Sequence, residues 1–308
     1  KAGAWNLVLN AQGRIQGDLH VWREGEALEL EIAADQYEKL LAHLDRFIIM
    51  DDVELAPLDG ITALGLTGPL AGELLVRLGL TAAPTIDVER KEVSVESHPS
   101  DKNKCVARVG HPIEPMTSER AAWNGAEVLV VRGYGELAQH FELWIQAAEV
   151  AKMWEALIGA GARPVGADSL EAFRIAEGIP AYGVDIAERD LPQETSQMRA
   201  LCFNKGCYLG QEIVERIRSR GSVHRHLRPL ELFGTVPAAG AALTWEGGAI
   251  AGSITSAAEV PLAAGSRLFA LGMIRGEAEL RSQPLYYTAG EVVGTARILT
   301  APPGLKAG

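Results

Sequence analysis

The stretch Lys205-Gly206-Cys207-Tyr208-Leu209-Gly210-Gln211-Glu212, here called the Cys207 octapeptide, carries the most specific pattern in this 308-residue chain. Its two glycines allow the backbone to turn tightly. From Leu209 onward, apolar residues recur every four positions as far as Ile217. This spacing predicts a helix that begins near Leu209 and has one apolar side. Cys207 is therefore expected at or just before a helix N-terminus.

A cysteine at that place has two possible uses. The start of a helix and the ammonium of Lys205 both favour a thiolate, which predicts a reactive Cys207. The alternative is a buried, inert cysteine that only fills space in the core. Cys202 lies between Leu201 and Phe203 and is expected to be buried, whereas Cys105 lies in a loop-rich stretch with no helix start.

Composition excludes several classes of protein. The chain is 47% hydrophobic and 22% charged, as globular proteins are, and has 29 basic against 40 acidic residues, for a net charge of −11. This balance argues against sequence-specific nucleic-acid binding, since phosphate contacts need clustered positive charge. No apolar run reaches the roughly 18–20 residues that a membrane span needs. Three cysteines cannot form a disulfide framework, which favours the cytoplasm. The chain begins at Lys1 without a Met, so natural N-terminal residues are expected to precede it.

The periodicity of the sequence predicts an α+β protein with a separate β-rich part. Residues 4–21 are expected to form two strands around a turn at residues 10–13. The segments LELEIAADQYEKLLAHL (28–44) and FELWIQAAEVAKMWEAL (141–157) share one pattern, an alternating strand followed by an amphipathic helix. Such a weak repeat is typical of a ferredoxin-like or related module. From Arg228 onward, short β segments follow one another at about ten-residue spacing, which predicts a small β-barrel.

The Cys207 octapeptide resembles the signature of the YgfZ family, folate-binding proteins linked to iron–sulfur cluster upkeep and thereby to tRNA modification. That family is similar in fold to the glycine-cleavage T-protein, an aminomethyltransferase. The resemblance extends over nearly the whole chain. It includes LVLNAQGRIQGDLHV (7–21), FRIAEGIPAYGVDIAERDLPQET (173–195) and the barrel segments GSITSAAEVP (252–261) and ALGMIRGEA (270–278).

This resemblance implies two α+β modules and a C-terminal β-barrel around a central folate pocket. Residues 1–23 with 160–225 would form the first module, residues 24–159 a ferredoxin-like second module, and residues 226–308 the barrel. It also implies tetrahydrofolate or another reduced folate as the ligand, and iron–sulfur enzymes or cluster-assembly proteins as partners. We expect a monomer that binds neither membrane nor specific nucleic acid.

The resemblance also implies roles for individual residues. Asp18 matches the catalytic aspartate of T-proteins, and Cys207 would be the reactive thiol, with both expected to share a pocket with Tyr182. T-proteins hold the pterin with the glutamate of an Arg-x-Glu-x-Gly pattern, but this chain has Ala176 there and Glu177 one residue later. One residue is about 100° of helix, so Glu177 either contacts the pterin from a new direction or is a solvated helix-end carboxylate. The expected folate-binding residues are Lys205, Tyr208, Gln211, Glu177, Tyr182 and Arg218.

A dense basic run follows the octapeptide. Arginines suit carboxylates and phosphates, so the run could bind a folate glutamate tail, an RNA or a protein. The alternative is a set of internal salt bridges to the surplus acidic residues. No metal site is expected, because three cysteines cannot supply a four-cysteine cage, although a cluster shared through Cys207 stays open. The run comprises Arg216, Arg218, Arg220, His224, Arg225, His226 and Arg228.

Three functions remain open at this point. The favoured one is a tetrahydrofolate-binding accessory factor that supports iron–sulfur cluster assembly or repair through Cys207. The second is a folate-dependent aminomethyltransferase or demethylase, in which Asp18 acts as acid or base. The third is an unrelated thiol enzyme, which would need a histidine base such as His224 beside Cys207. Whether the protein turns over a substrate is left undecided.

Overall fold

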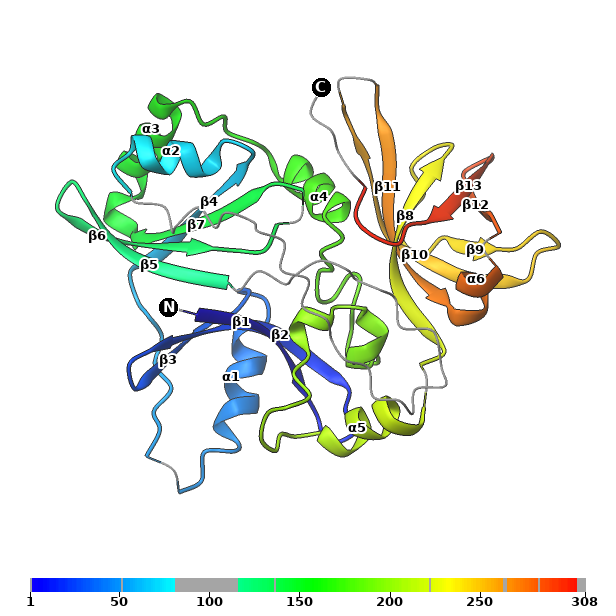
Figure 1. Ribbon diagram of the computed structural model, residues 1–308, viewed down its shortest axis with the longest axis horizontal. Coiled ribbons are helices and arrows are strands. Elements are labelled where there is room, and N and C mark those ends of the chain that lie inside the picture. Colours follow the sequence, from blue (N-terminus) through cyan, green and yellow to red (C-terminus); the bar gives the residue numbers. More distant parts are fainter. Residues whose placement is uncertain are drawn as a thin grey trace. The chain divides into compact units, whose positions relative to one another are not determined.

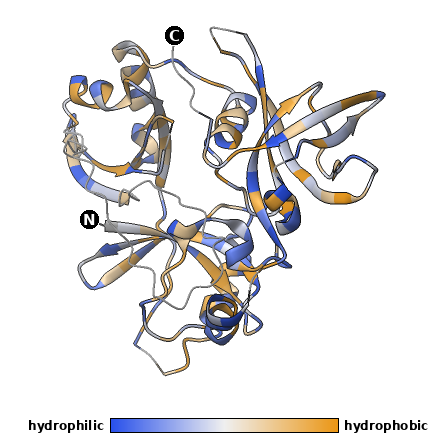
Figure 2. Ribbon diagram, turned by 45° about the vertical axis from the view of Figure 1, so that its right-hand side comes forward, coloured by the Kyte–Doolittle hydropathy of each residue, from blue (hydrophilic) through white to orange (hydrophobic). Residues whose placement is uncertain are grey.

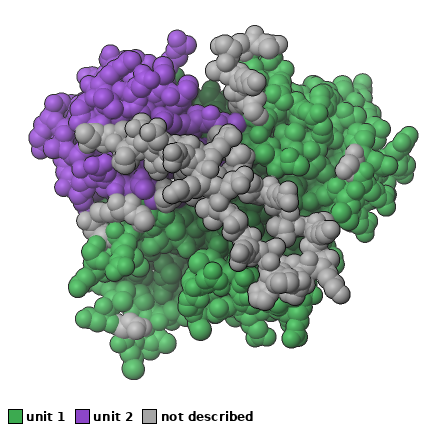
Figure 3. Space-filling view, viewed as in Figure 1, with its two compact units in different colours: residues 1, 3–59, 164–308 green, residues 2, 60–163 purple. Residues whose placement is uncertain are grey.

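The computed structural model describes residues 2–50, 52–80, 116–135, 137–221, 223–262, 265–281 and 283–303. The chain divides into two compact units, unit 1 with residues 1, 3–59 and 164–308, and unit 2 with residues 2 and 60–163 (Figure 3). Within the described ranges, every helix is too short or too polar to cross a membrane. The division into three modules stays a prediction.

Unit 1 begins with three antiparallel strands in the order β3-β2-β1 (Figure 1). They are β1 (Ala2–Leu9), β2 (Ile15–Glu24) and β3 (Ala27–Glu31). The side chain of Asn10 closes the first turn by accepting hydrogen bonds from the backbone N–H groups of Gln12 and Arg14, both at 3.0 Å. The register places Leu7 opposite Asp18. The predicted pair of strands around residues 10–13 is therefore confirmed.

Before the barrel, the described residues of unit 1 also form three α-helices and two 3-10 helices. Helix α1 packs close to β2, since a Cβ atom on Gly17 would lie 2.8 Å from Leu40. Gly210, with φ of +82°, precedes the first residue of α5 in the left-handed region, which a helix cannot include. The helix therefore begins two residues later than the sequence indicated. The elements are α1 (Tyr37–Asp45), α4 (Ala167–Ala176), η2 (Pro192–Thr195), η3 (Met198–Ala200) and α5 (Gln211–Arg220).

The C-terminal part of unit 1 is a closed six-stranded barrel in the order β10-β11-β8-β13-β12-β9. This confirms the barrel expected from Arg228 onward, although strand β12 was not predicted. Its strands carry both hydrophobic and hydrophilic residues (Figure 2), and the buried hydrophobic ones, such as Leu230, Ile254 and Ile274, form the core of the barrel. The elements are β8 (Arg225–Phe233), β9 (Ala242–Thr244), β10 (Ile250–Val260), β11 (Arg267–Arg275), α6 (Gly276–Arg281), β12 (Leu285–Ala289) and β13 (Val292–Ile298).

A buried carboxylate joins the barrel to the preceding segment of unit 1. The Asp185 side chain is fully buried and pairs with Arg174 of α4 at 2.6 Å. It also accepts hydrogen bonds from the hydroxyls of Thr255 (2.5 Å) and Ser256 (2.7 Å) of β10 and from the backbone N–H of Ala181 (3.0 Å). Because the carboxylate is so fully satisfied, it stabilises this contact between α4 and β10.

In the described residues of unit 2, four antiparallel strands in the order β5-β6-β7-β4 are accompanied by two α-helices and one 3-10 helix. Alternate residues of β7, namely Phe141, Leu143 and Ile145, are buried in its core. The strand-then-helix order of the weak repeat is confirmed in both places, β3 before α1 and β7 before α3. The elements are β4 (Ile61–Gly68), α2 (Ala71–Arg77), β5 (Met116–Trp123), β6 (Ala126–Arg132), β7 (Gln139–Gln146), η1 (Ala147–Glu149) and α3 (Val150–Ala160).

Candidate functional site

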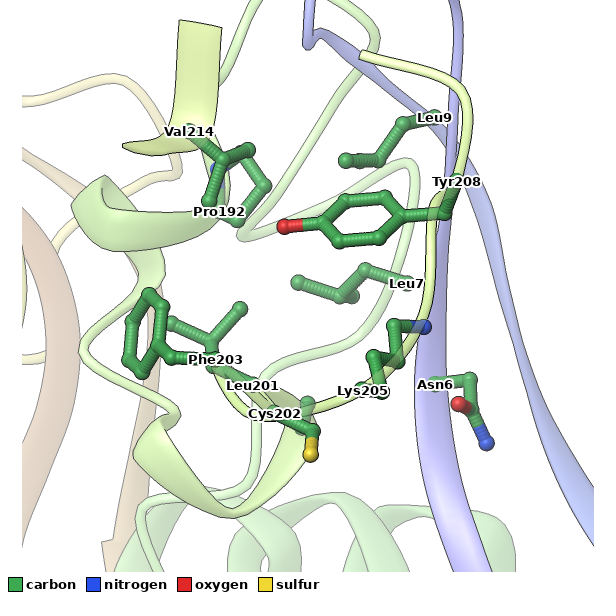
Figure 4. Close-up of a pocket in the computed structure, with 11 residues that line it drawn as sticks. Asn6, Leu7, Leu9, Pro192, Leu201, Cys202, Phe203, Lys205, Tyr208 and Val214 are labelled. Atoms are coloured by element: carbon green, nitrogen blue, oxygen red, sulfur yellow. The ribbon is translucent and has the colours of Figure 1, made fainter. Parts of the chain in front are cut away.

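A shallow hollow, partly open to solvent, lies in unit 1 beside the Cys207 octapeptide (Figure 4). We call it the Tyr208 hollow. Leu7 and Leu9 of β1 and Val214 of α5 give it apolar walls, and Lys205 and Tyr208 add an ammonium and a hydroxyl. Its remaining lining residues are Asn6, Pro192, Ala200, Leu201, Cys202 and Phe203.

Two cation–aromatic contacts flank the hollow. The Lys205 ammonium lies 4.5 Å from the centre of the Tyr208 ring, and the Arg218 guanidinium lies 4.5 Å from the centre of the Phe203 ring. Burial and the charges of Glu215 and Cys202 raise the pKa of Tyr208, an effect that Arg218 partly offsets. The phenol therefore stays protonated at neutral pH and can donate a hydrogen bond. The hollow thus combines apolar walls, two nearby cations and one neutral donor.

The octapeptide is fixed to the turn between β1 and β2 by two glycines. A Cβ atom on Gly210 would lie 2.6 Å from the carbonyl oxygen of Asn10 and 2.8 Å from the Cα of Gly13. On the other side, a Cβ atom on Gly13 would lie 2.9 Å from Ile213. By contrast, a Cβ atom on Gly206 would meet nothing within 4 Å. The octapeptide therefore packs closely against this turn at Gly210, whereas the space beside Gly206 is open.

The described thiols of the chain, Cys202 and Cys207, are both free and exposed. The expected burial of Cys202 is wrong, because the irregular segment that carries it bends along the edge of the Tyr208 hollow. Cys207 lies before Gly210, outside α5, and the influence of a helix dipole is confined to its end turns. Within the described ranges, no histidine forms a hydrogen bond with Cys207. Cys105 falls outside the described residues.

Asp18 and Tyr182 belong to the same unit as the octapeptide but do not line the Tyr208 hollow. Asp18 lies on β2 opposite Leu7, which does line it. The Tyr182 hydroxyl accepts a hydrogen bond from Lys39 at 2.8 Å, and Tyr182 packs against the buried cluster of Leu9, Ile15 and Val214. Cys207 is also absent from the lining, so the grouping of these residues in one folate site stays a prediction.

The remaining predicted ligand residues have defined places in unit 1. Glu177 follows α4 and is only 1% exposed, so it is not a solvated helix-end carboxylate. Ala176, at the position of the T-protein glutamate, is also 1% exposed. Gln211 is half-buried at the start of α5, where its backbone N–H donates to the carbonyl of Tyr208 at 3.2 Å.

The basic run divides into an internal and an exposed half. Arg225 pairs with Asp190 at 2.7 Å and with Glu194 at 3.0 Å, and Arg228 pairs with Glu279 at 2.9 Å. The salt-bridge interpretation is therefore confirmed for this half. On α5, the side chains of Arg216, Arg218 and Arg220 are exposed, and Arg218 contacts Glu215 at 3.4 Å. This exposed half remains available to an anionic ligand.

The described part of the chain contains no group of three or more His, Cys, Asp or Glu side chains that could hold a metal ion.

The chain matches no protein-family model. It is 27% identical to an aminomethyltransferase of Rubrobacter xylanophilus over 263 residues, which are 85% of this chain and 63% of that protein. It is 24% identical over 240 residues to a mitochondrial iron–sulfur cluster assembly factor IBA57 homolog of Pyricularia oryzae, covering 76% of this chain and 49% of that protein. The chain thus spans less than two thirds of the length of these relatives.

A solved structure shows the fold. The glycine cleavage system aminomethyltransferase T of Bartonella henselae superposes with a TM-score of 0.75, over 99% of this chain and 77% of that chain. The sequences are 18% identical in this comparison, so the match concerns the fold alone. The α+β architecture with a C-terminal barrel expected from the sequence is therefore confirmed, and the chain has the fold of the T-protein aminomethyltransferases.

Proposed function

We propose that this protein is a tetrahydrofolate-binding accessory factor that supports iron–sulfur cluster assembly or repair, with Cys207 as its reactive residue. The observation that carries the proposal is the exposed Cys207 thiol on an octapeptide fixed at Gly210 and bordering the Tyr208 hollow. The similarity to an iron–sulfur cluster assembly factor homolog supports the same assignment.

The residues around the Tyr208 hollow fit part of a reduced folate. Ligand pockets commonly combine apolar walls with a few polar groups, as the residues around this hollow do. Tyr208 would donate to a ring acceptor, while Lys205 and Arg218 would bind the carboxylates of the glutamate tail. Bound tetrahydrofolate would supply one-carbon chemistry. Gln211, Glu177 and Tyr182 are proposed as further polar contacts.

Cys207 is proposed to act on a cluster that another protein carries. A thiolate is the usual protein ligand of iron–sulfur clusters. Since the described residues of this chain hold no group of three metal-binding side chains, the partner would supply the other ligands. Iron–sulfur enzymes or cluster-assembly proteins are therefore the proposed partners, and the cluster is their cargo.

A folate-dependent aminomethyltransferase or demethylase is the second candidate. The aminomethyltransferase relatives and the position of Asp18 on β2 favour it. Ala176 argues against it, because the carboxylate that T-proteins direct at the pterin is missing there. Loss of such a charge-assisted hydrogen bond typically costs about 1.5–3 kcal/mol.

Two measurements test the proposal. Anaerobic calorimetric titration with tetrahydrofolate and folinic acid should show binding, and Tyr208→Phe should weaken it. Complementation of a strain depleted of the endogenous factor should restore iron–sulfur enzyme activity with wild type and with Cys202→Ala, the matched exposed thiol, but not with Cys207→Ala.

Different failures separate the candidates. If Cys207→Ala restores enzyme activity as well as wild type does, the role assigned to the thiol is wrong. Robust formation of methylene-tetrahydrofolate from an aminomethyl-lipoyl carrier would instead establish the second candidate. Binding of neither folate would leave only the thiol function.

A further inference from the structure

An irregular segment follows helix α1. In the described residues from 46 to 60, all but Asp51, the chain forms neither helix nor strand, and it runs past the end of α1 before it turns back toward β4 (Figure 1). Connections of more than about 12–15 residues without regular structure are uncommon in compact domains, and binding loops are among the usual cases. We call residues 47–58 of this connection, which belong to unit 1, the 47–58 segment.

Large apolar side chains of the 47–58 segment face solvent. Met50 is 94% exposed and Ile49 83%, followed by Leu58 at 61%, Val53 at 56% and Phe47 at 50%. Single exposed apolar residues are ordinary on a protein surface, but several gathered in one place mark an interaction site. Phe and Met are also enriched at protein–protein interfaces. The segment is therefore a candidate contact surface.

The end of α1 supports the first part of this segment. The backbone N–H groups of Phe47 and Ile48 donate to the carbonyls of Leu44 and Asp45 at 3.0 and 3.1 Å. The Phe47 ring lies edge-on to the ring of His43, with 5.3 Å between the ring centres. Because these contacts already order the chain there, less conformational freedom is lost when a partner binds.

Acidic side chains flank and interrupt the apolar ones. Asp45, Asp52, Glu54 and Asp59 are exposed, and within the described part of the chain none of their carboxylates forms an ion pair. Over the described residues from 45 to 59, Arg46 supplies the single opposing charge. Complementary charge brings partners together and like charge rejects them, so this surface favours a basic partner over an acidic protein or an anionic membrane.

We propose that the 47–58 segment is the docking site for a partner protein whose own surface has an apolar centre surrounded by lysines and arginines. Ile49 and Met50, the most exposed apolar side chains of the segment, would be buried by the partner, and Asp52 and Glu54 would face its cations. The inference goes beyond the proposed function, because it needs neither folate binding nor the Cys207 thiol.

Photo-cross-linking from position 50 identifies the partner. The purified full chain, with p-benzoylphenylalanine in place of Met50, is irradiated in an extract of the cells that naturally produce it, and adducts are identified by mass spectrometry. The same label in place of Val293 is the matched control, because Val293 of β13 is an apolar side chain that is 69% exposed. Position 50 should give an adduct with a protein that position 293 does not label.

Reconstitution from the two purified proteins then decides whether the apolar side chains make the contact. The double variant Ile49→Ser with Met50→Ser should weaken the Kd at least tenfold, as the loss of central apolar contacts does at interfaces. Val293→Ser removes an equally exposed apolar side chain from the barrel and should leave the Kd unchanged. Circular dichroism should show both variants folded, since the replaced side chains are exposed.

The rate of association tests the charge of the partner. Asp52→Lys with Glu54→Lys should slow association at low salt at least tenfold, and added salt should slow the wild type more than this variant. Glu291→Lys is the control, because Glu291 is an exposed carboxylate in the turn between β12 and β13. If the charge reversal leaves the rate as Glu291→Lys does, the basic character of the partner is refuted.

The remaining outcomes overturn the docking site. They are an absence of any adduct specific to position 50, or equal binding of the double serine variant and Val293→Ser. An adduct with a second copy of this chain, with a dimer in sedimentation velocity that the serine variant lacks, would instead establish self-association. Binding to phosphatidylcholine vesicles that the serine variant lacks would establish a membrane contact. Tetrahydrofolate titration of the serine variant should match wild type, so this inference and the proposed function fail separately.

Discussion

Replacing Gly210 by alanine perturbs the point at which the octapeptide meets the β1–β2 turn. Gly210 has φ of +82°, in the left-handed region that side-chain-bearing residues avoid. The new methyl group would also lie 2.6 Å from the carbonyl oxygen of Asn10 and 2.8 Å from the Cα of Gly13. Both contacts are with backbone, which cannot move aside as the end of a flexible side chain can.

The cost has two parts. A left-handed conformation costs a non-glycine residue about 1–2 kcal/mol. An extra methyl group forced into a close-packed site costs about 1–3 kcal/mol. Their sum predicts that Gly210→Ala lowers the free energy of unfolding by about 2–5 kcal/mol. Since domains are stable by about 5–15 kcal/mol, the effect is large enough to measure.

Gly206→Ala is the matched control. It places the same methyl group in the same octapeptide, where nothing lies within 4 Å and the backbone is not left-handed. Urea denaturation, followed by far-UV circular dichroism and tryptophan fluorescence, should give Gly206→Ala a midpoint close to wild type. If Gly210→Ala also unfolds within about 0.5 kcal/mol of wild type, the variation typical of surface substitutions, the argument that the octapeptide is fixed at Gly210 is refuted.

Three further predictions concern unit 1. Asp185→Asn should lower the free energy of unfolding by about 3–5 kcal/mol, because Arg174 loses a buried charged partner; an unchanged urea midpoint would contradict this. Burial raises the pKa of Glu231, but the hydrogen bonds from Arg267 and Arg297 lower it by more, so the pKa lies below its usual 4.5. Ionised Glu231 therefore stabilises the folded protein fully above pH 4.5, and this stabilisation is lost as the pH falls through the lower pKa of the folded state. Glu231→Gln should therefore make the melting temperature depend less on pH below pH 4.5. A decrease in melting temperature with falling pH as steep as that of wild type would refute this. Finally, a thiol reagent should modify both Cys202 and Cys207 in the folded protein; mass spectrometry that finds Cys202 unmodified would contradict its exposure.

Local periodicity was sufficient to predict much of the fold. The short β segments predicted at residues 250–255 and 266–274 agree with β10 and β11. Strand β12, Leu285–Ala289, was missed. It is only five residues long and follows a helical turn directly, so it offers too few alternations to indicate a strand.

The candidate site was less predictable, because its contacts join distant parts of the chain. The sequence indicated that Lys205 and Tyr208 belong to the site, and both line the Tyr208 hollow. The sequence did not indicate Gln36. Its side-chain amide forms two hydrogen bonds with Asp18 only because α1 packs against β2. The prediction that Cys202 is buried was wrong for a related reason. Apolar neighbours indicate burial on a regular strand, but this residue lies on an irregular bend.

Gly206 and Gly210 show that two glycines of one sequence motif can have different structural surroundings. In the sequence they are equivalent glycines that flank Cys207 and Tyr208, whereas in the fold only Gly210 is constrained by a neighbouring backbone. The octapeptide therefore has a fixed end and an open end, and the thiol lies toward the open end. Cys207 is exposed. If, as we propose, its thiol reaches a cluster carried by another protein, that contact requires the free access that this exposed position gives.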